Sequence, residues 1–163
     1  MNLVSTHPLA PPRFVSSPSL LIFGLNQRYQ HSNAGIPSQW DRFLPHFGHI
    51  PSQVGRVAYG VVYNIDEANS FDYLCGVQVP AFPAHPVDFT RLEVPPQTYA
   101  VFEHRDHISA IQSTWTQIWE HALKAAGCST TDGPFFERYG EQFDSTTGLG
   151  GVELWIPIAP RNA

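Results

Sequence analysis

The sequence predicts an α+β domain made of two similar halves, each a β-β-α-β-β unit, related by pseudo-twofold symmetry. The main observation is an internal repeat at an offset of 75 residues, which falls in two separate segments. The helix-like segment repeats three residues: Ile36 as Ile111, Ser38 as Ser113, and Trp40 as Trp115. The strand-like segment repeats Gly76-Val77-Gln78 as Gly151-Val152-Glu153. Two matches in one register indicate a duplicated supersecondary unit.

Length and composition favour one domain with a sizeable core. The chain has 163 residues, of which 13% are aromatic and 14% are charged. Aromatic side chains in such excess line a core, a pocket or an interface. We expect the proline-containing residues 1–12 to form a flexible lead-in. Residues 13–163 are expected to form a single domain, with halves of about 13–82 and 87–159.

The first half predicts a strand, a helix and a hairpin. Residues 20–30 are apolar, then alternate, and end in a polar turn, which is typical of a strand. A helix is predicted next, because apolar residues recur at helical spacing: Ile36, Trp40, Phe43, Leu44 and Phe47. Residues 56–64 and 71–80 then predict the two strands of a hairpin.

The second half predicts a hairpin, a helix and two further strands. The hairpin spans residues 89–94 and 97–104, and the last two strands span residues 134–142 and 150–158. The helix between them is predicted from a longer apolar stripe: Ile108, Ile111, Trp115, Ile118, Trp119 and Ala122. Two antiparallel sheets, each backed by one helix, can bury these stripes and leave a central groove where the halves meet.

Charge and motif content exclude several classes of protein. The net charge is −5 and the nine Lys and Arg residues are scattered, which argues against direct nucleic-acid binding and mildly favours cationic partners. No apolar run of about 18 residues could span a membrane, and no secretory signal is evident, so we expect a cytoplasmic protein. The sequence has no G-x-S-x-G elbow, phosphate-binding loop or G-x-G-x-x-G stretch, and we expect no cofactor.

Two histidine pairs have the spacing of metal ligands. They are His46 with His49 and His104 with His107. Neither pair is accompanied by the cysteines or carboxylates that would complete a metal site. We therefore expect surface or turn histidines and no metal.

The carboxylates near the end of the chain have different expected surroundings. In residues 150–158 the aliphatic side chains face one side, and Glu153 and Trp155 face the other. Glu153 replaces the neutral Gln78 of the first copy. It either points to water or lies partly desolvated in an aromatic groove, where it would pair with a cationic guest. Glu137 and Glu141 share one strand face, and we expect both to be exposed to solvent.

Six short motifs follow one another along the chain: Ile36-Pro37-x-x-Trp40-x-x-Phe43, Tyr59-Gly60-Val61, Phe71-Asp72-Tyr73-x-x-Gly76, Tyr99-Ala100-Val101-Phe102, Phe136-Glu137-Arg138-Tyr139 and Val152-Glu153-Leu154-Trp155-Ile156-Pro157-Ile158. In this order they resemble the GyrI-like (gyrase-inhibitor-like) small-molecule-binding superfamily, over roughly residues 14–159. The most similar branch is the stand-alone integron-cassette type of effector-binding protein, which is related to the effector domains of AraC-type regulators.

The resemblance implies a duplicated SH2-like motif, which is not a phosphotyrosine module, around a central ligand groove. It further implies that Glu153 contacts cationic lipophilic compounds. An aromatic ring around this carboxylate is expected from residues at motif positions: Tyr59, Phe136, Tyr139 and Trp155. Packing in the core or between strands is the alternative for each of these four. Trp40 and Trp115 lie on the helix stripes and are expected in the core.

This chain departs from the family pattern in two places. Where members often have Trp-Leu-Pro near the end of the second helix, it has Ala122-Leu123-Lys124, and the smaller Ala122 could widen the groove or repack it. In addition, no helix-turn-helix precedes the first strand, so a transcription factor that acts alone is not expected.

Three functions stay open at this point. The favoured one is a stand-alone effector-binding domain, without catalysis, for a hydrophobic cationic small molecule. The resemblance also allows a hydrolase of strained cyclopropane-type electrophiles, in which Glu153 would activate a water. The third is a protein-interaction module, either inhibiting a topoisomerase or attaching to a separate regulator protein. The sequence does not decide between a monomer and a dimer.

Overall fold

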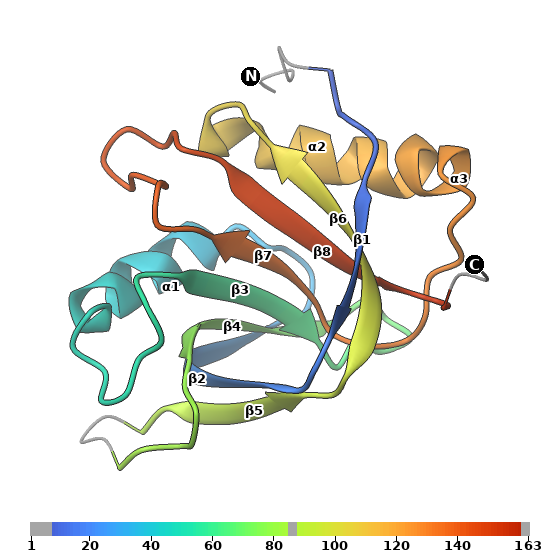
Figure 1. The fold of residues 1–163 in the computed structure, drawn as a ribbon. Helices are drawn as coiled ribbons and strands as arrows, with labels where there is room; N and C mark the ends of the chain where they lie inside the picture. The colour runs from blue at the N-terminus through green and yellow to red at the C-terminus, as the bar shows by residue number, and fades with distance from the viewer. Residues whose placement is uncertain (1–7, 85–87, 161–163) are drawn as a thin grey trace.

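The helices of the protein pack on one antiparallel sheet of eight strands (Figure 1). The computed structural model describes residues 8–84 and 88–160. The strands are β1 (Arg13–Ser17), β2 (Leu20–Tyr29), β3 (Ala58–Tyr63), β4 (Phe71–Gln78), β5 (Thr90–Val94), β6 (Gln97–His104), β7 (Phe135–Tyr139) and β8 (Val152–Ile158). The helices are α1 (Ile36–Phe43), α2 (Ile111–Gln117) and α3 (Leu123–Ala125).

The expected order of elements is confirmed, although the sequence predicts no residue range for one of the strands. That strand is β1, which is short and largely exposed and therefore carries little apolar alternation. Pro37 lies in the first turn of α1, as expected for a residue that lacks a backbone N–H. A π-helical turn, Ile118–Ala122, joins α2 to α3 in one continuous helical segment.

The two expected sheets are in fact one, because β3 and β7 pair along the boundary between the halves. The strand order is β1-β6-β8-β7-β3-β4-β2-β5. If the order is reversed and β1 is exchanged with β5, β2 with β6, β3 with β7 and β4 with β8, the same order results. Val61 pairs directly with Phe136, and these two residues are themselves 75 positions apart. The symmetry of the topology therefore centres on this pair, while an internal duplication of the sequence stays a prediction.

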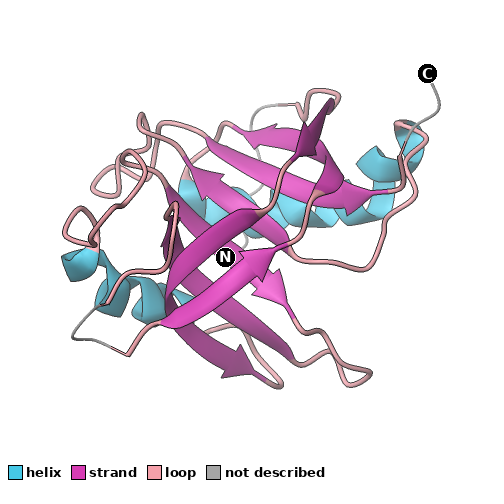
Figure 2. Cartoon of the chain, turned by 60° about the horizontal axis from the view of Figure 1, so that its bottom comes forward, coloured by secondary structure: helices cyan, strands magenta, loops and turns pink. Residues whose placement is uncertain are grey.

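The sheet is covered on both faces. Beneath α2 lies one apolar cluster with Phe102 and Leu154, and beneath α1 lies another with Phe23 and Cys75. A third cluster, which we call the aromatic cluster, occupies the face opposite the helices and includes Tyr59, Tyr99, Phe136 and Trp155. Figure 2 shows how strongly the sheet twists between the two helical segments. Both faces of the central strands are thus buried.

Residues 8–12 lead into the first strand without forming a helix or strand. Leu9 packs against the apolar cluster beneath α2. The remainder of the expected lead-in, residues 1–7, lies outside the described residues. Among the residues that the structure describes, no helix is long and apolar enough to cross a membrane.

Candidate functional site

A cavity of about 830 Å³ lies between the two helical segments, over the centre of the sheet. Its floor comes from β3, β4 and β7, and its walls come from residues 33–44 and 108–119. The cavity therefore lies where the two halves meet, which is where the sequence predicts a groove. Its volume falls in the range of cavities that hold drug-sized molecules.

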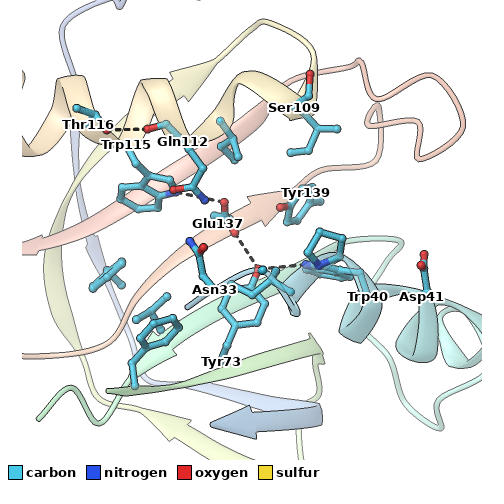
Figure 3. Close-up of a pocket in the computed structure, with 18 of the residues that line it drawn as sticks. Asn33, Trp40, Asp41, Tyr73, Ser109, Gln112, Trp115, Thr116, Glu137 and Tyr139 are labelled. Atoms are coloured by element: carbon cyan, nitrogen blue, oxygen red, sulfur yellow. Dashed lines mark hydrogen bonds between the residues drawn. The ribbon is translucent and has the colours of Figure 1, made fainter. Parts of the chain in front are cut away.

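The Glu137 carboxylate lies at the centre of the cavity floor (Figure 3). Only 7% of this residue is exposed, so the expectation that it faces solvent is wrong. The physical reason is that β7 is an interior strand, between β3 and β8, and the helices cover its cavity face. Glu141 lies beyond the end of β7 and is exposed, as expected.

A tyrosine and a tryptophan donate hydrogen bonds to this carboxylate, and a second tryptophan donates to the tyrosine (Figure 3). The Tyr73 hydroxyl donates to Oε1 of Glu137 at 2.8 Å, and Nε1 of Trp115 donates to Oε2 at 3.2 Å. Nε1 of Trp40 donates to the Tyr73 hydroxyl at 3.1 Å. Trp115 belongs to the core cluster as expected. Trp40 and Trp115 also line the cavity, and their indole N–H groups donate hydrogen bonds at its floor.

The electrostatics of the cavity favour a positive charge. Burial raises the pKa of Glu137, and hydrogen bonds from Tyr73, Trp115 and, to a smaller extent, Tyr139 oppose this shift. All three donors are neutral. Among the described residues that line the cavity none is Lys, Arg or His, and Asp41 adds a second, exposed carboxylate. The buried charge is therefore compensated only by neutral dipoles.

Aromatic rings flank the carboxylate from both sides. On the other helical segment the rings of Trp115, on α2, and Trp119, in the π-helical turn, are stacked with centroids 5.9 Å apart, and Phe135 meets Trp119 edge-on at 5.3 Å. On the α1 side Trp40 meets Tyr139 edge-on at 5.1 Å. Trp119 is unusual for its residue type because 45% of it is exposed. Ring faces of this kind attract organic cations.

Of the predicted aromatic ring, only Tyr139 lines the cavity. Tyr59, Phe136 and Trp155 belong to the aromatic cluster on the opposite face. Phe136 stacks on Trp155 at 5.2 Å, and neighbouring residues of a strand point to opposite faces. Since Glu137 points into the cavity, Phe136 must point away from it.

Glu153 also lies on the face opposite the cavity. Its carboxylate accepts hydrogen bonds from Arg13 at 2.5 Å and from Arg138 at 3.2 Å, and its side chain is 22% exposed. Trp155 donates from Nε1 to the same carboxylate at 3.3 Å, so this predicted pair does come together. Burial alone would raise the pKa of Glu153, but Arg13, Trp155 and Arg138 outweigh it and the net shift is downward.

Glu153→Gln should lower the free energy of unfolding by about 0.5 to 1 kcal/mol at neutral pH, the scale of a partly exposed ion pair. Because the folded-state pKa is depressed, this stability is present above the unfolded value of about 4.3 and is lost as pH falls through the folded value. Urea unfolding of wild type and variant at pH 7 and at about pH 3 measures the difference. An equal difference at both pH values would contradict this account.

The histidine pairs do not form a metal site in the described part of the chain, where no group of three or more potential ligands gathers. His104 departs from the expected surface position, since it is 1% exposed. Its Nδ1 lies 2.7 Å from the Thr114 hydroxyl, and its Nε2 lies 2.9 Å from the backbone oxygen of His107. This histidine anchors the start of α2 to β6.

Glu137 and Tyr73 line the cavity but are not among the site residues that the sequence predicts. The offset of 75 residues contains a signal for the first of them, because it makes Val62 the counterpart of Glu137 in the first half. Both residues line the cavity, one neutral and one acidic. The asymmetry that matters at the cavity floor is therefore Val62 against Glu137, not Gln78 against Glu153.

Comparison with known proteins assigns this architecture to a family. The model of the GyrI-like small molecule binding domain matches residues 10–159. The chain belongs to the GyrI-like family. A curated relative, the transcriptional regulator BrlR of Pseudomonas aeruginosa strain PAO1, is 28% identical over 148 residues, which cover 90% of this chain and 54% of BrlR. The GyrI-like chain thus spans about half the length of that regulator.

Solved structures share the fold of this GyrI-like domain. SAV2435 bound to tetraphenylphosphonium matches with a TM-score of 0.74 and 19% identity, over 92% of this chain and 94% of that one. An integron cassette protein from Vibrio cholerae matches with a TM-score of 0.69 and 14% identity, covering 93% and 97% of the two chains. The EcmrR C-terminal domain matches with a TM-score of 0.63 and 13% identity, covering 91% and 97%. At these identities the likeness establishes the fold.

Proposed function

We propose that this GyrI-like domain binds a hydrophobic organic cation in the cavity, with the Glu137 carboxylate as the central charged group. The observation that carries the proposal is a buried carboxylate whose hydrogen-bond donors are all neutral. A bound cation would supply the missing counter-charge in a site that excludes water, where such an interaction is strong. We assign the role of the ligand-binding carboxylate to Glu137 instead of Glu153, because Glu153 already has two arginine partners.

The shape of the cavity supports the same class of ligand. Aromatic rings from α1 and α2 face the carboxylate, and a cation with flat apolar groups can contact ring faces and charge together. The structural neighbour with tetraphenylphosphonium supports a lipophilic cation as the first probe. We further propose that the chain acts as an effector-binding domain, alone or with a regulator protein. The hydrolase and protein-interaction functions and the cytoplasmic location stay predictions from the sequence.

Tryptophan fluorescence offers a direct test, because Trp40, Trp115 and Trp119 line the cavity. Titration with tetraphenylphosphonium should give a saturable change with one site per chain. We expect a dissociation constant in the micromolar range, which corresponds to roughly 8 kcal/mol. A change that rises linearly with ligand, without saturation, would contradict binding in the cavity.

Cation affinity should increase with pH through the pKa of Glu137 in the free protein and level off above it. The sign follows because the cation stabilises the ionised carboxylate, so a protonated Glu137 must first lose its proton. The other titratable groups facing the site are Tyr73, Tyr139, Cys75 and Asp41. Burial raises the pKa of the two tyrosines and of Cys75, which keeps them neutral in this range.

Calorimetric titration with tetraphenylphosphonium between about pH 5 and pH 8 measures this dependence, with an expected slope of at most about tenfold per pH unit. The Glu137→Gln variant is the control and should show a flat profile. A wild-type profile as flat as that of the variant would show that Glu137 does not couple to the cation.

A further inference from the structure

Gly60, in the middle of β3, lies between the Tyr73 hydroxyl and the Glu137 carboxylate, which share a hydrogen bond at the cavity floor. The strand register pairs Gly60 with Cys75 on β4 and with Glu137 on β7. Directly paired residues share a face, so a side chain at position 60 would point into the cavity floor. The φ angle of Gly60 is not in the left-handed region, so its backbone conformation does not require glycine.

The reason for glycine at this position is space. A Cβ atom on Gly60 would overlap the Tyr73 hydroxyl, and it would lie 2.8 Å from Cζ of Tyr73 and 3.2 Å from Oε1 of Glu137. Real Cβ atoms essentially never approach other atoms as closely as the first two contacts. Glycine inside a strand weakens the sheet, and it often marks a point of close approach.

Several contacts hold the Tyr73 ring in place and would be lost if the ring moved aside. Tyr73 is buried, its hydroxyl accepts the hydrogen bond from Trp40, and its ring packs edge-on against the Trp40 ring at 6.4 Å. The hydroxyl extends from β4 across the whole width of β3 to reach a carboxylate on β7. This path is open only because β3 carries no side chain at the crossing point.

We propose that Gly60 is a positioning residue of the cavity, which admits the Tyr73 hydroxyl to Glu137 and thereby sets how tightly the carboxylate holds a cation. The consequence for cation affinity rests on the proposed function, whereas the effect on Glu137 does not. Loss of a hydrogen bond to the charged form disfavours ionisation, so the pKa of Glu137 should rise when a side chain is placed at position 60. At a pH below the raised midpoint, cation affinity should then fall by up to about tenfold for each pH unit by which the midpoint rises.

Gly60→Ala tests the proposal, with Gly140→Ala as the matched control. A Cβ on Gly140 would have Arg138 Nη1 as its nearest neighbour at 3.9 Å, which is an ordinary contact. The first readout is the titration of the Glu137 carboxyl carbon by NMR in the ligand-free protein, assigned with Glu137→Gln. The second is affinity for tetraphenylphosphonium. We expect a higher titration midpoint and weaker binding for Gly60→Ala, and neither change for Gly140→Ala.

Tyr73→Phe removes the hydroxyl without crowding β3 and should raise the Glu137 midpoint in the same direction. An unchanged midpoint in a folded Gly60→Ala protein would overturn the proposal. If the wild type fails to bind tetraphenylphosphonium, the proposed function fails, yet the midpoints of the ligand-free proteins still decide the role of Gly60.

Gly60→Ala could instead prevent folding, and a double variant then decides. Tyr73→Leu shortens the side chain that the new Cβ would overlap, so the combination of Gly60→Ala with Tyr73→Leu should fold when Gly60→Ala alone does not. Circular dichroism and urea unfolding measure this rescue. A double variant that is as unfolded as Gly60→Ala would show that crowding of Tyr73 is not the reason for glycine, and would overturn the proposal.

Discussion

Glu137→Gln should remove most of the preference for cations while the protein stays folded. The substitution keeps the shape of the side chain and removes the charge that no basic side chain balances among the described residues of the cavity. We expect a loss of roughly 2 to 3 kcal/mol in binding tetraphenylphosphonium, the scale of a charge-assisted contact in a sheltered site. Calorimetry gives the affinity, and urea unfolding shows whether the variant is folded.

The effect on stability should be small because two contributions oppose each other. The buried charge no longer has to be desolvated, which favours the variant. The new amide can keep its oxygen as the acceptor for the Trp115 N–H, but its NH2 group then faces the Tyr73 hydroxyl, which loses the acceptor for its own proton. A net change within about 1 kcal/mol is therefore expected.

Glu153→Gln is the matched control, since it makes the same substitution in a carboxylate that two arginines neutralise. Its affinity for tetraphenylphosphonium should equal that of the wild type. The opposite pattern, in which Glu153→Gln weakens binding and Glu137→Gln does not, would instead support the ligand groove around Glu153 that the sequence predicts.

Phe136→Ala should lower the free energy of unfolding by about 3 to 5 kcal/mol, the usual cost of deleting a buried aromatic ring. The Phe136 side chain is 1% exposed and contacts the rings of Tyr59, Tyr99 and Trp155. Because it points away from the cavity, the folded fraction should bind the cation as the wild type does. Urea unfolding and calorimetry at low temperature, where the variant stays folded, measure the two quantities.

Phe135→Ala makes the same substitution one position earlier, on the cavity face of the same strand. It removes a ring that meets Trp115 and Trp119 edge-on, so it should weaken cation binding. Phe135 is less buried than Phe136, and its loss should cost less stability. A larger loss of affinity in Phe136→Ala than in Phe135→Ala would contradict the assignment of faces.

The sequence predicts the local elements of the fold better than their long-range pairing. Hydrophobic periodicity predicts both helical segments and seven of the eight strands, because these features depend on neighbours in the chain, although Leu44 and Trp119 of the predicted apolar stripes are exposed. The pairing of β3 with β7, which merges the two expected sheets, depends on residues 75 positions apart. No local pattern reports such a pairing.

The candidate site shows the same limit at the level of single residues. Alternation correctly separates Glu153 from Leu154, but it does not say which face of the sheet holds the cavity. In this fold the aromatic cluster buries the face opposite the helices, so aromatic residues are common on both faces. Glu137 lies in the cavity because β7 is a central strand, and this placement depends on the long-range pairing of β7 with β3 and β8.

Selection of positive charge by the cavity can be measured with a pair of ligands that have one shape and opposite charge. Tetraphenylphosphonium and tetraphenylborate have similar size and the same four phenyl rings, so apolar contacts contribute similarly to both. We propose calorimetric titration of the wild-type protein with each ion in one buffer. If the cavity selects positive charge, we expect saturable binding of tetraphenylphosphonium at one site and at least about a hundredfold weaker binding of tetraphenylborate. Equal affinity for the two ions, or tighter binding of tetraphenylborate, would contradict it.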